Sequence, residues 1–171
     1  MIPAIDVKYK EKGAVPRKMR KVYTASSKVA WYDTGIRFHG EFRDKRFSVA
    51  HARKAGYKPR RGEEPGLTQQ EFFRSYTGRK LKKFGHRRPL EFSGETRRNV
   101  RSASISSTSK GSRVRYPGAR KLNFRNPHSD IRMAEEFRKL LPDEITDLAQ
   151  HYDRKLDHEM NADNTTETRS I

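Results

Sequence analysis

The stretch that most constrains the fold is residues 89–117, PLEFSGETRRNVRSASISSTSKGSRVRYP. It predicts a short apolar strand over Pro89–Phe92, a Ser-Gly turn, and two longer strands joined by a tight turn. Apolar and arginine side chains alternate along the last strand, from Arg113 to Tyr116, and this period of two, bounded by Gly, Ser and Pro, is typical of a β-hairpin. Gly111 would tolerate a positive φ at the turn. The sequence therefore predicts a small antiparallel sheet.

The exposed face of this predicted ribbon is rich in arginine. A solvated sheet face carries charge for solubility, and edge strands use charge to avoid aggregation. The alternative interpretation is a contact surface for a partner, because so many cations exceed what solubility requires. The arginines of this face are Arg97, Arg98, Arg101, Arg113 and Arg115.

Residues 24–54 are expected to form a helix, with its N-cap at Thr24, Ser26 or Ser27 and its end by Gly56. An aromatic stripe repeats at i, i+4, i+7 and i+11, the spacing of one helix face, and indicates a core contact. A glycine inside this stripe would also let another backbone come close. The stripe consists of Trp31, Gly35, Phe38 and Phe42.

A bent helical pair is expected after residue 128, with Ser129 or Asp130 as its N-cap and a second helix near 142–160. Pro142 interrupts a straight helix but suits the first turn of a new one. An apolar face continues through both helices and should cover the sheet of 89–117. The predicted fold class is therefore α+β: a small antiparallel sheet packed by an N-terminal helix and a bent C-terminal helical pair, with extended arms.

The expected domain organisation is an extended basic arm over 1–23, a single α+β domain over 24–161 and a flexible tail over 162–171. The domain carries an irregular basic loop at 56–88, in which Thr68 and Glu71 match a capping box for a short helix.

Charge is distributed unevenly along the chain of 171 residues. The net charge is +18, yet residues 1–125 hold 33 basic and 10 acidic side chains whereas residues 126–171 hold 6 basic and 11 acidic ones. A basic body suggests a polyanionic neighbour, either nucleic acid or an acidic protein surface. The apolar fraction of 32% is low for an isolated globule and suits a chain that gains order from partners.

The loop at 56–88 concentrates the cations of the basic body. They alternate with Tyr76, Leu81 and Phe84, and basic residues interleaved with aromatics bind phosphate backbones and stack on bases. A long loop in a compact domain is usually functional, so a contact loop is expected rather than a passive insertion. Its candidate contact residues are Arg79, Lys80, Lys82, Lys83, Arg87 and Arg88.

No catalytic constellation is recognisable in the sequence. There is no cysteine, which excludes disulfides and thiol chemistry, and no P-loop, dinucleotide-binding or nucleophile-elbow motif. The six histidines show no metal-ligand spacing, and Glu91 and Glu95 have no evident proton-transfer partner. No apolar run approaches the length of a membrane span. We therefore expect a non-enzyme without cofactor or metal, made in a cytoplasm and not inserted in a membrane.

The order of elements resembles a known family. A helical N-terminal part ends in Lys45-Arg46-Phe47, an irregular basic loop follows, and then Pro89-Leu90-x-x-Ser93-Gly94-Glu95-x-Arg97 precedes a hairpin and a C-terminal helix. Over residues 29–160 this resembles the tail-completion and head–tail joining (virion morphogenesis) proteins of long-tailed bacteriophages. Thr96 stands where that family usually has leucine.

The resemblance implies a structural virion protein that assembles as a ring at the neck or tail top. Its expected partners are copies of itself, neighbouring neck, connector or tail-tube proteins and, without sequence specificity, packaged DNA. The alternative is a basic RNA-binding protein such as a ribosome-associated subunit, because composition and arms fit that class as well. A nuclease would need a carboxylate cluster for Mg²⁺ that the sequence lacks.

Overall fold

A computed structural model describes residues 17–125, 127 and 129–164. The described chain divides into two compact units, each assembled from separate stretches. Unit 1 contains residues 43–102 and 116–139, and unit 2 contains residues 17–42, 103–115 and 140–164. Residues 1–16 of the expected arm and 165–171 of the expected tail lie outside the described residues.

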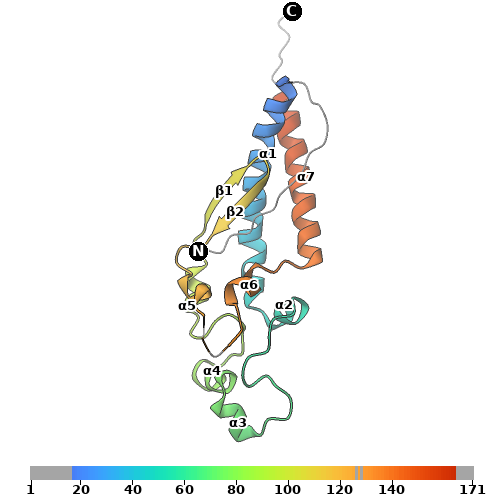
Figure 1. Cartoon of the computed structure of the whole chain (residues 1–171). Coiled ribbons are helices and arrows are strands. Elements are labelled where there is room, and N and C mark those ends of the chain that lie inside the picture. Colours follow the sequence, from blue (N-terminus) through green and yellow to red (C-terminus); the bar gives the residue numbers. More distant parts are fainter. Residues whose placement is uncertain (1–16, 126, 128, 165–171) are drawn as a thin grey trace, which may run out of the picture. The chain divides into compact units, whose positions relative to one another are not determined.

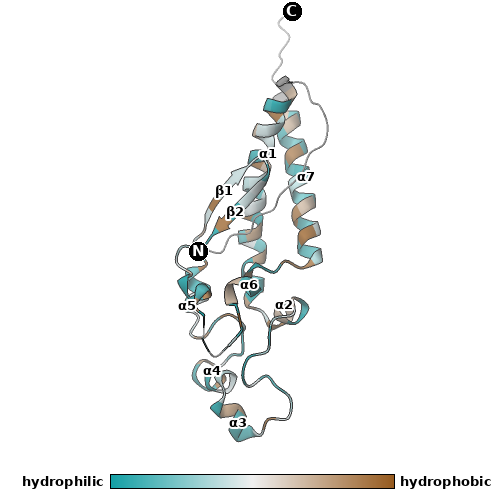
Figure 2. Ribbon diagram, in the orientation of Figure 1, coloured by the Kyte–Doolittle hydropathy of each residue, from teal (hydrophilic) through white to brown (hydrophobic). Residues whose placement is uncertain are grey.

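Unit 2 is built on a long helix, α1 (Arg17–Arg37), which continues into a π-helical turn, η1 (Phe38–Phe42). Helix α7 (Pro142–Asn164) runs alongside α1 (Figure 1), and Figure 2 shows apolar and polar residues alternating along it. Trp31 packs on Tyr152 with ring centroids 4.2 Å apart, beside the fully buried Ala30. Polar contacts also join the helices: Arg37 donates to Asp147 at 2.8 Å, and His151 Nε2 lies 2.7 Å from Asp33 Oδ2.

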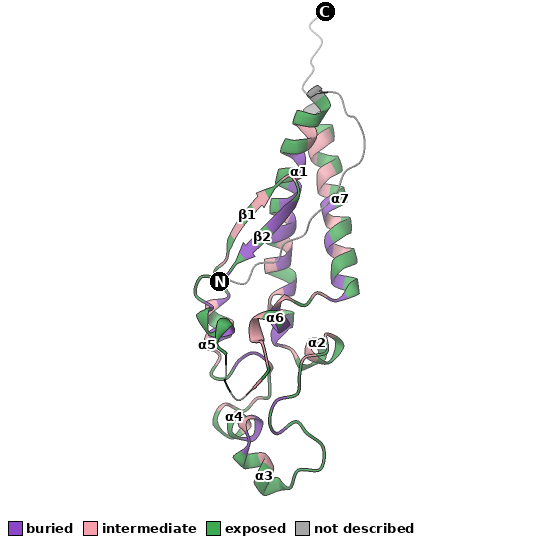
Figure 3. Cartoon of the chain, viewed as in Figure 1, coloured by how far each residue is buried: buried purple, intermediate pink, exposed green. Residues whose placement is uncertain are grey.

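The sheet of unit 2 is a two-stranded antiparallel hairpin, β1 (Ser104–Thr108) and β2 (Gly111–Arg115), with Ile105 paired to Val114. β2 is the more buried strand (Figure 3). The hairpin packs on α1 at Gly35, where an added Cβ would lie 2.3 Å from Ser112 Oγ. The close contacts at this glycine come from side chains of the hairpin, and not from another backbone as the sequence suggested.

Unit 1 contains the short elements: η2 (Asp44–Phe47), α2 (Val49–Lys54), α3 (Gln69–Arg74), α4 (Tyr76–Phe84), α5 (Glu95–Asn99), η3 (Arg120–Asn123) and α6 (Met133–Arg138). Its core centres on Phe137, whose ring lies 5.9 Å from that of Phe47 and 5.4 Å from that of Tyr116. Burial raises the pKa of the Tyr116 hydroxyl.

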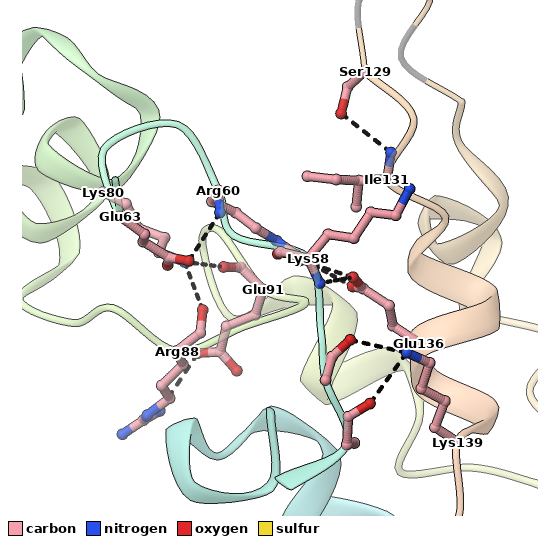
Figure 4. A network of polar contacts seen from close by, with 12 residues as sticks. Lys58, Arg60, Glu63, Lys80, Arg88, Glu91, Ser129, Ile131, Glu136 and Lys139 are labelled. Carbon is pink, nitrogen blue, oxygen red and sulfur yellow. Dashed lines mark hydrogen bonds and ion pairs between the residues drawn. The ribbon is translucent and has the colours of Figure 1, made fainter. Parts of the chain in front are cut away.

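A polar network fastens the segment after α2 to α6 (Figure 4). Glu136, which is buried, accepts hydrogen bonds from the backbone N–H of Lys58 at 2.9 Å and from both terminal nitrogens of Arg60. Lys139 donates to the carbonyls of Ala55 and Gly56 at 3.1 and 2.9 Å. These bonds hold an otherwise irregular segment in one conformation.

The predicted α+β class is confirmed, with an antiparallel hairpin and long N- and C-terminal helices. The break before Pro142, the capping box of Thr68 and Glu71, and the buried stripe of Trp31, Phe38 and Phe42 are also confirmed.

Several element boundaries were wrong. Helix α1 begins at Arg17, so residues 17–23 are helical and do not belong to an extended arm. The N-caps expected between Thr24 and Ser27 lie inside this helix. The expected helix over 24–54 breaks at Phe42, and the expected loop at 56–88 contains α3 and α4.

The ribbon prediction was too long at its N-terminal end. Pro89–Phe92 forms no strand, and residues 95–99 form helix α5, which starts after Gly94 in a left-handed conformation with φ of 80°. Gly111 does not have a positive φ. α6 has Arg132 as its N-cap, without a side-chain hydrogen bond, in place of Ser129 or Asp130.

Candidate functional site

The basic loop contributes a well-defined helix, α4, to unit 1. The Ser75 hydroxyl accepts a hydrogen bond from Gly78 N–H at 3.1 Å and caps its start, and Gly85 ends it in a left-handed conformation with φ of 69°. Gly78 permits close packing on α3, since an added Cβ would lie 1.9 Å from the Phe72 carbonyl oxygen. The orientation of the α4 side chains is therefore fixed at both ends of the helix.

One face of α4 is basic. Arg79, Lys82 and Lys83 follow one another at i, i+3 and i+4 and are all exposed, and the exposed Arg87 and Arg88 come directly after the helix. No acidic residue occurs between Glu71 and Glu91. Like charges at this spacing destabilise a helix by about 0.2–0.5 kcal/mol per pair. We refer to these five exposed residues as the α4 basic face; an anion bound there would offset their repulsion.

Lys80 differs from its neighbours because its side chain is buried, 1% exposed. Its ammonium group donates to the carbonyls of Arg88 and Glu91, the latter at 3.2 Å (Figure 4). Burial lowers the pKa of Lys80. Lys80 therefore fixes the segment that follows α4 and does not reach the surface as the sequence-based prediction supposed.

Aromatic rings lie among the cations. Phe92 stacks on Tyr76 with centroids 5.4 Å apart and meets Phe84 edge-on at 5.0 Å, yet 41% of Phe92 is exposed. Lys83 Nζ lies 5.4 Å from the Phe84 ring, and the Arg87 guanidinium lies 4.8 Å from that of Phe72. Cations beside aromatic rings provide the two kinds of contact that a single-stranded nucleic acid uses, charge and stacking.

The remaining predicted contact residues are placed elsewhere. Arg97 and Arg98 belong to helix α5 in unit 1, and Arg97 pairs with Asp44 at 3.6 Å. Arg113 and Arg115 are exposed on β2 in unit 2. The prediction that five arginines lie on one face of a β-ribbon was therefore wrong, because the first part of that stretch is helical.

An open groove of about 810 Å³ in unit 1 was not predicted from the sequence. It shares Phe72 and Arg87 with the region of the basic face, and Arg53, Lys58 and Glu63 also line it. These residues come from three separated stretches, so no local pattern could have identified the groove.

No group of three or more His, Asp or Glu side chains could hold a metal ion within residues 17–125, 127 and 129–164. His86 lies 3.3 Å from Glu91, and burial lowers the pKa of this histidine. In the same part of the chain no helix is both long and apolar enough to cross a membrane.

Comparison of the chain with protein-family models, curated proteins and solved structures finds no match.

Proposed function

We propose that this chain is a structural virion protein of a tailed phage, a tail-completion or neck component that assembles into a ring and joins head and tail. It acts by binding other proteins rather than by catalysis. The proposal rests on two grounds. The order of elements along the sequence resembles that of the tail-completion and head–tail joining proteins, and one structural observation carries the argument.

That observation is the difference in charge between unit 1 and helix α7. Unit 2 as a whole is close to neutral, with 11 basic and 9 acidic side chains among its described residues. The described residues of unit 1 include 24 basic and 9 acidic side chains, whereas helix α7 of unit 2 has 7 acidic and 2 basic ones. A protein that joins two different neighbours needs surfaces of different chemistry. The α4 basic face suits an acidic protein ring or DNA, and α7 suits a basic surface.

The hairpin of unit 2 adds support. Each strand has five residues, and within the described residues the sheet has only these two strands, so both outer edges lack a strand partner. Sheets of two strands are marginal by themselves. Assembly with neighbouring subunits would supply the contacts that this small sheet lacks.

The test is the mass of the full-length protein, treated with nuclease, by light scattering at low and high salt. We expect a defined ring-sized oligomer free of nucleic acid. A monomer that co-purifies with RNA and releases it at high salt would overturn the joining role.

The α4 basic face with its exposed ring of Phe92 favours a second candidate, an RNA-binding protein. Here the variant K82E/K83E should weaken RNA binding and leave the oligomer intact, and R113E/R115E serves as the charge-matched control outside unit 1. Losing two phosphate contacts should reduce the slope of log affinity against log salt by about 1.4 for single strands. If K82E/K83E instead disrupts assembly without affecting RNA binding, the joining role is supported.

A further inference from the structure

Helix α1 has an exposed apolar stripe. Val29, Tyr32 and Ile36 are 43%, 46% and 44% exposed, and their i, i+3, i+7 spacing places them on one face. The half-buried Val22 and the exposed Ala25 extend the same face toward the N-terminus. The intervals between these five residues are alternately three and four positions, which is the a/d pattern of a coiled-coil seam. We call them the α1 seam.

Neither partner of α1 in unit 2 covers the seam. The face toward α7 is formed by Ala30 and Arg37, and the face toward the hairpin by Gly35. An isolated exposed apolar residue is ordinary, but a continuous stripe along a rigid helix usually marks an interaction site.

The spacing indicates what would cover the seam. Apolar residues at heptad positions insert as knobs between four residues of a facing helix, so the expected occupant is a helix with the same pattern. Helix α7 does not offer one, because its outward residues Asp143, Asp153 and Asp157 are exposed and acidic.

The charges beside the seam favour a second α1 in parallel orientation. With Val22, Val29 and Ile36 at position a, Lys28 occupies position g and Asp33 position e. One carboxylate oxygen of Asp33 contacts His151 of α7, but the side chain is still 36% exposed. In a parallel pair a g residue faces the e residue five positions later in the partner, which sets Lys28 against Asp33; an antiparallel pair would set Lys28 against Lys28.

We propose that the α1 seam packs in parallel against the α1 seam of further copies of this chain. This inference rests on the self-assembly in the proposed function and gives it a specific interface. Parallel helices around one axis have cyclic symmetry, which is the symmetry of a ring.

The first experiment measures the oligomer mass of full-length V29E and I36E by light scattering. A charge in the seam should convert the oligomer to monomer, with an unchanged circular dichroism spectrum. The matched control is V49E: Val49, on α2 of unit 1, is 44% exposed but lies in no heptad, and this variant should assemble as wild type does. If the seam variants keep the wild-type mass, the seam inference is overturned while self-assembly stands; a monomeric wild type overturns both.

The second experiment uses the absence of cysteine from the chain. Ile36→Cys alone should form a disulfide-linked dimer on mild oxidation, because parallel seams bring equal positions together. If I36C cross-links only when mixed with V22C, the seams are antiparallel and the proposed orientation is wrong.

Discussion

Replacement of Gly35 by alanine tests the contact between α1 and the hairpin. The new Cβ would lie 2.3 Å from Ser112 Oγ and 2.8 Å from Ile105 Cγ2, both shorter than real contacts. The hydroxyl can rotate, but the β-branched isoleucine is stiff, so the hairpin must shift. Overpacking costs about 1–3 kcal/mol, and the better helix propensity of alanine returns about 1 kcal/mol. We expect a net loss of up to about 2 kcal/mol in the free energy of unfolding.

Urea unfolding followed by circular dichroism measures this loss. Gly40→Ala is the control, because nothing lies within 4 Å of its added Cβ, and it should be neutral or slightly stabilising. Ser112→Ala should also be nearly neutral, since its buried hydroxyl has no hydrogen-bond partner among the described residues, and it should recover part of the Gly35→Ala loss. If Gly35→Ala is as stable as Gly40→Ala, the hairpin does not pack on α1 as described.

Three further predictions concern buried or paired charges. Lys80→Met leaves two carbonyls without their donor and should lower the stability of the protein by about 1–3 kcal/mol in urea unfolding; an unchanged midpoint would refute the buried position of the ammonium group. Glu136→Ala leaves the buried guanidinium of Arg60 unpaired and should cost about 3–5 kcal/mol, measured in the same way, whereas a loss below 1 kcal/mol would contradict the pairing. The hydrogen bond from Arg37 lowers the pKa of Asp147, so its contribution is complete above the ordinary aspartate pKa and is lost as the pH falls through the lowered value. Asp147→Asn should therefore cost about 0.2–1 kcal/mol at neutral pH and progressively less as the pH falls below the ordinary aspartate pKa, and thermal melts that show the same difference at every pH would refute the pairing.

The sequence predicted best the elements whose signals are local. The capping box at Thr68, the first-turn proline at Pro142 and the alternation along β2 each specify structure within a few residues. The aromatic stripe that runs from α1 into η1 was recognisable in the sequence for the same reason.

The missed features depend on contacts between distant residues. The side chain of Lys80 in α4 donates hydrogen bonds to carbonyls eight and eleven residues away and so fixes the segment after the helix. In the sequence, Lys80 could not be distinguished from its exposed neighbours. Five-residue helices such as α5 have little intrinsic stability, so tertiary packing decides whether they form. The cluster of cations in the candidate site was predictable from the sequence. The sequence did not show which of these cations is buried or which of them belong to other elements.

The hydroxyl of Ser27 has a consequence for biosynthesis. It donates to the Ser109 carbonyl and accepts from the Tyr152 hydroxyl, both at 2.8 Å, and so connects three stretches separated by 82 and 125 residues. Translation delivers α1 before α7, so the buried face around Trp31 has no covering helix until α7, more than 100 residues further along the chain, has left the ribosome. Unit 2 therefore completes its fold only after α7 has emerged, and a chain terminated before α7 would expose that face to aggregation or to a chaperone.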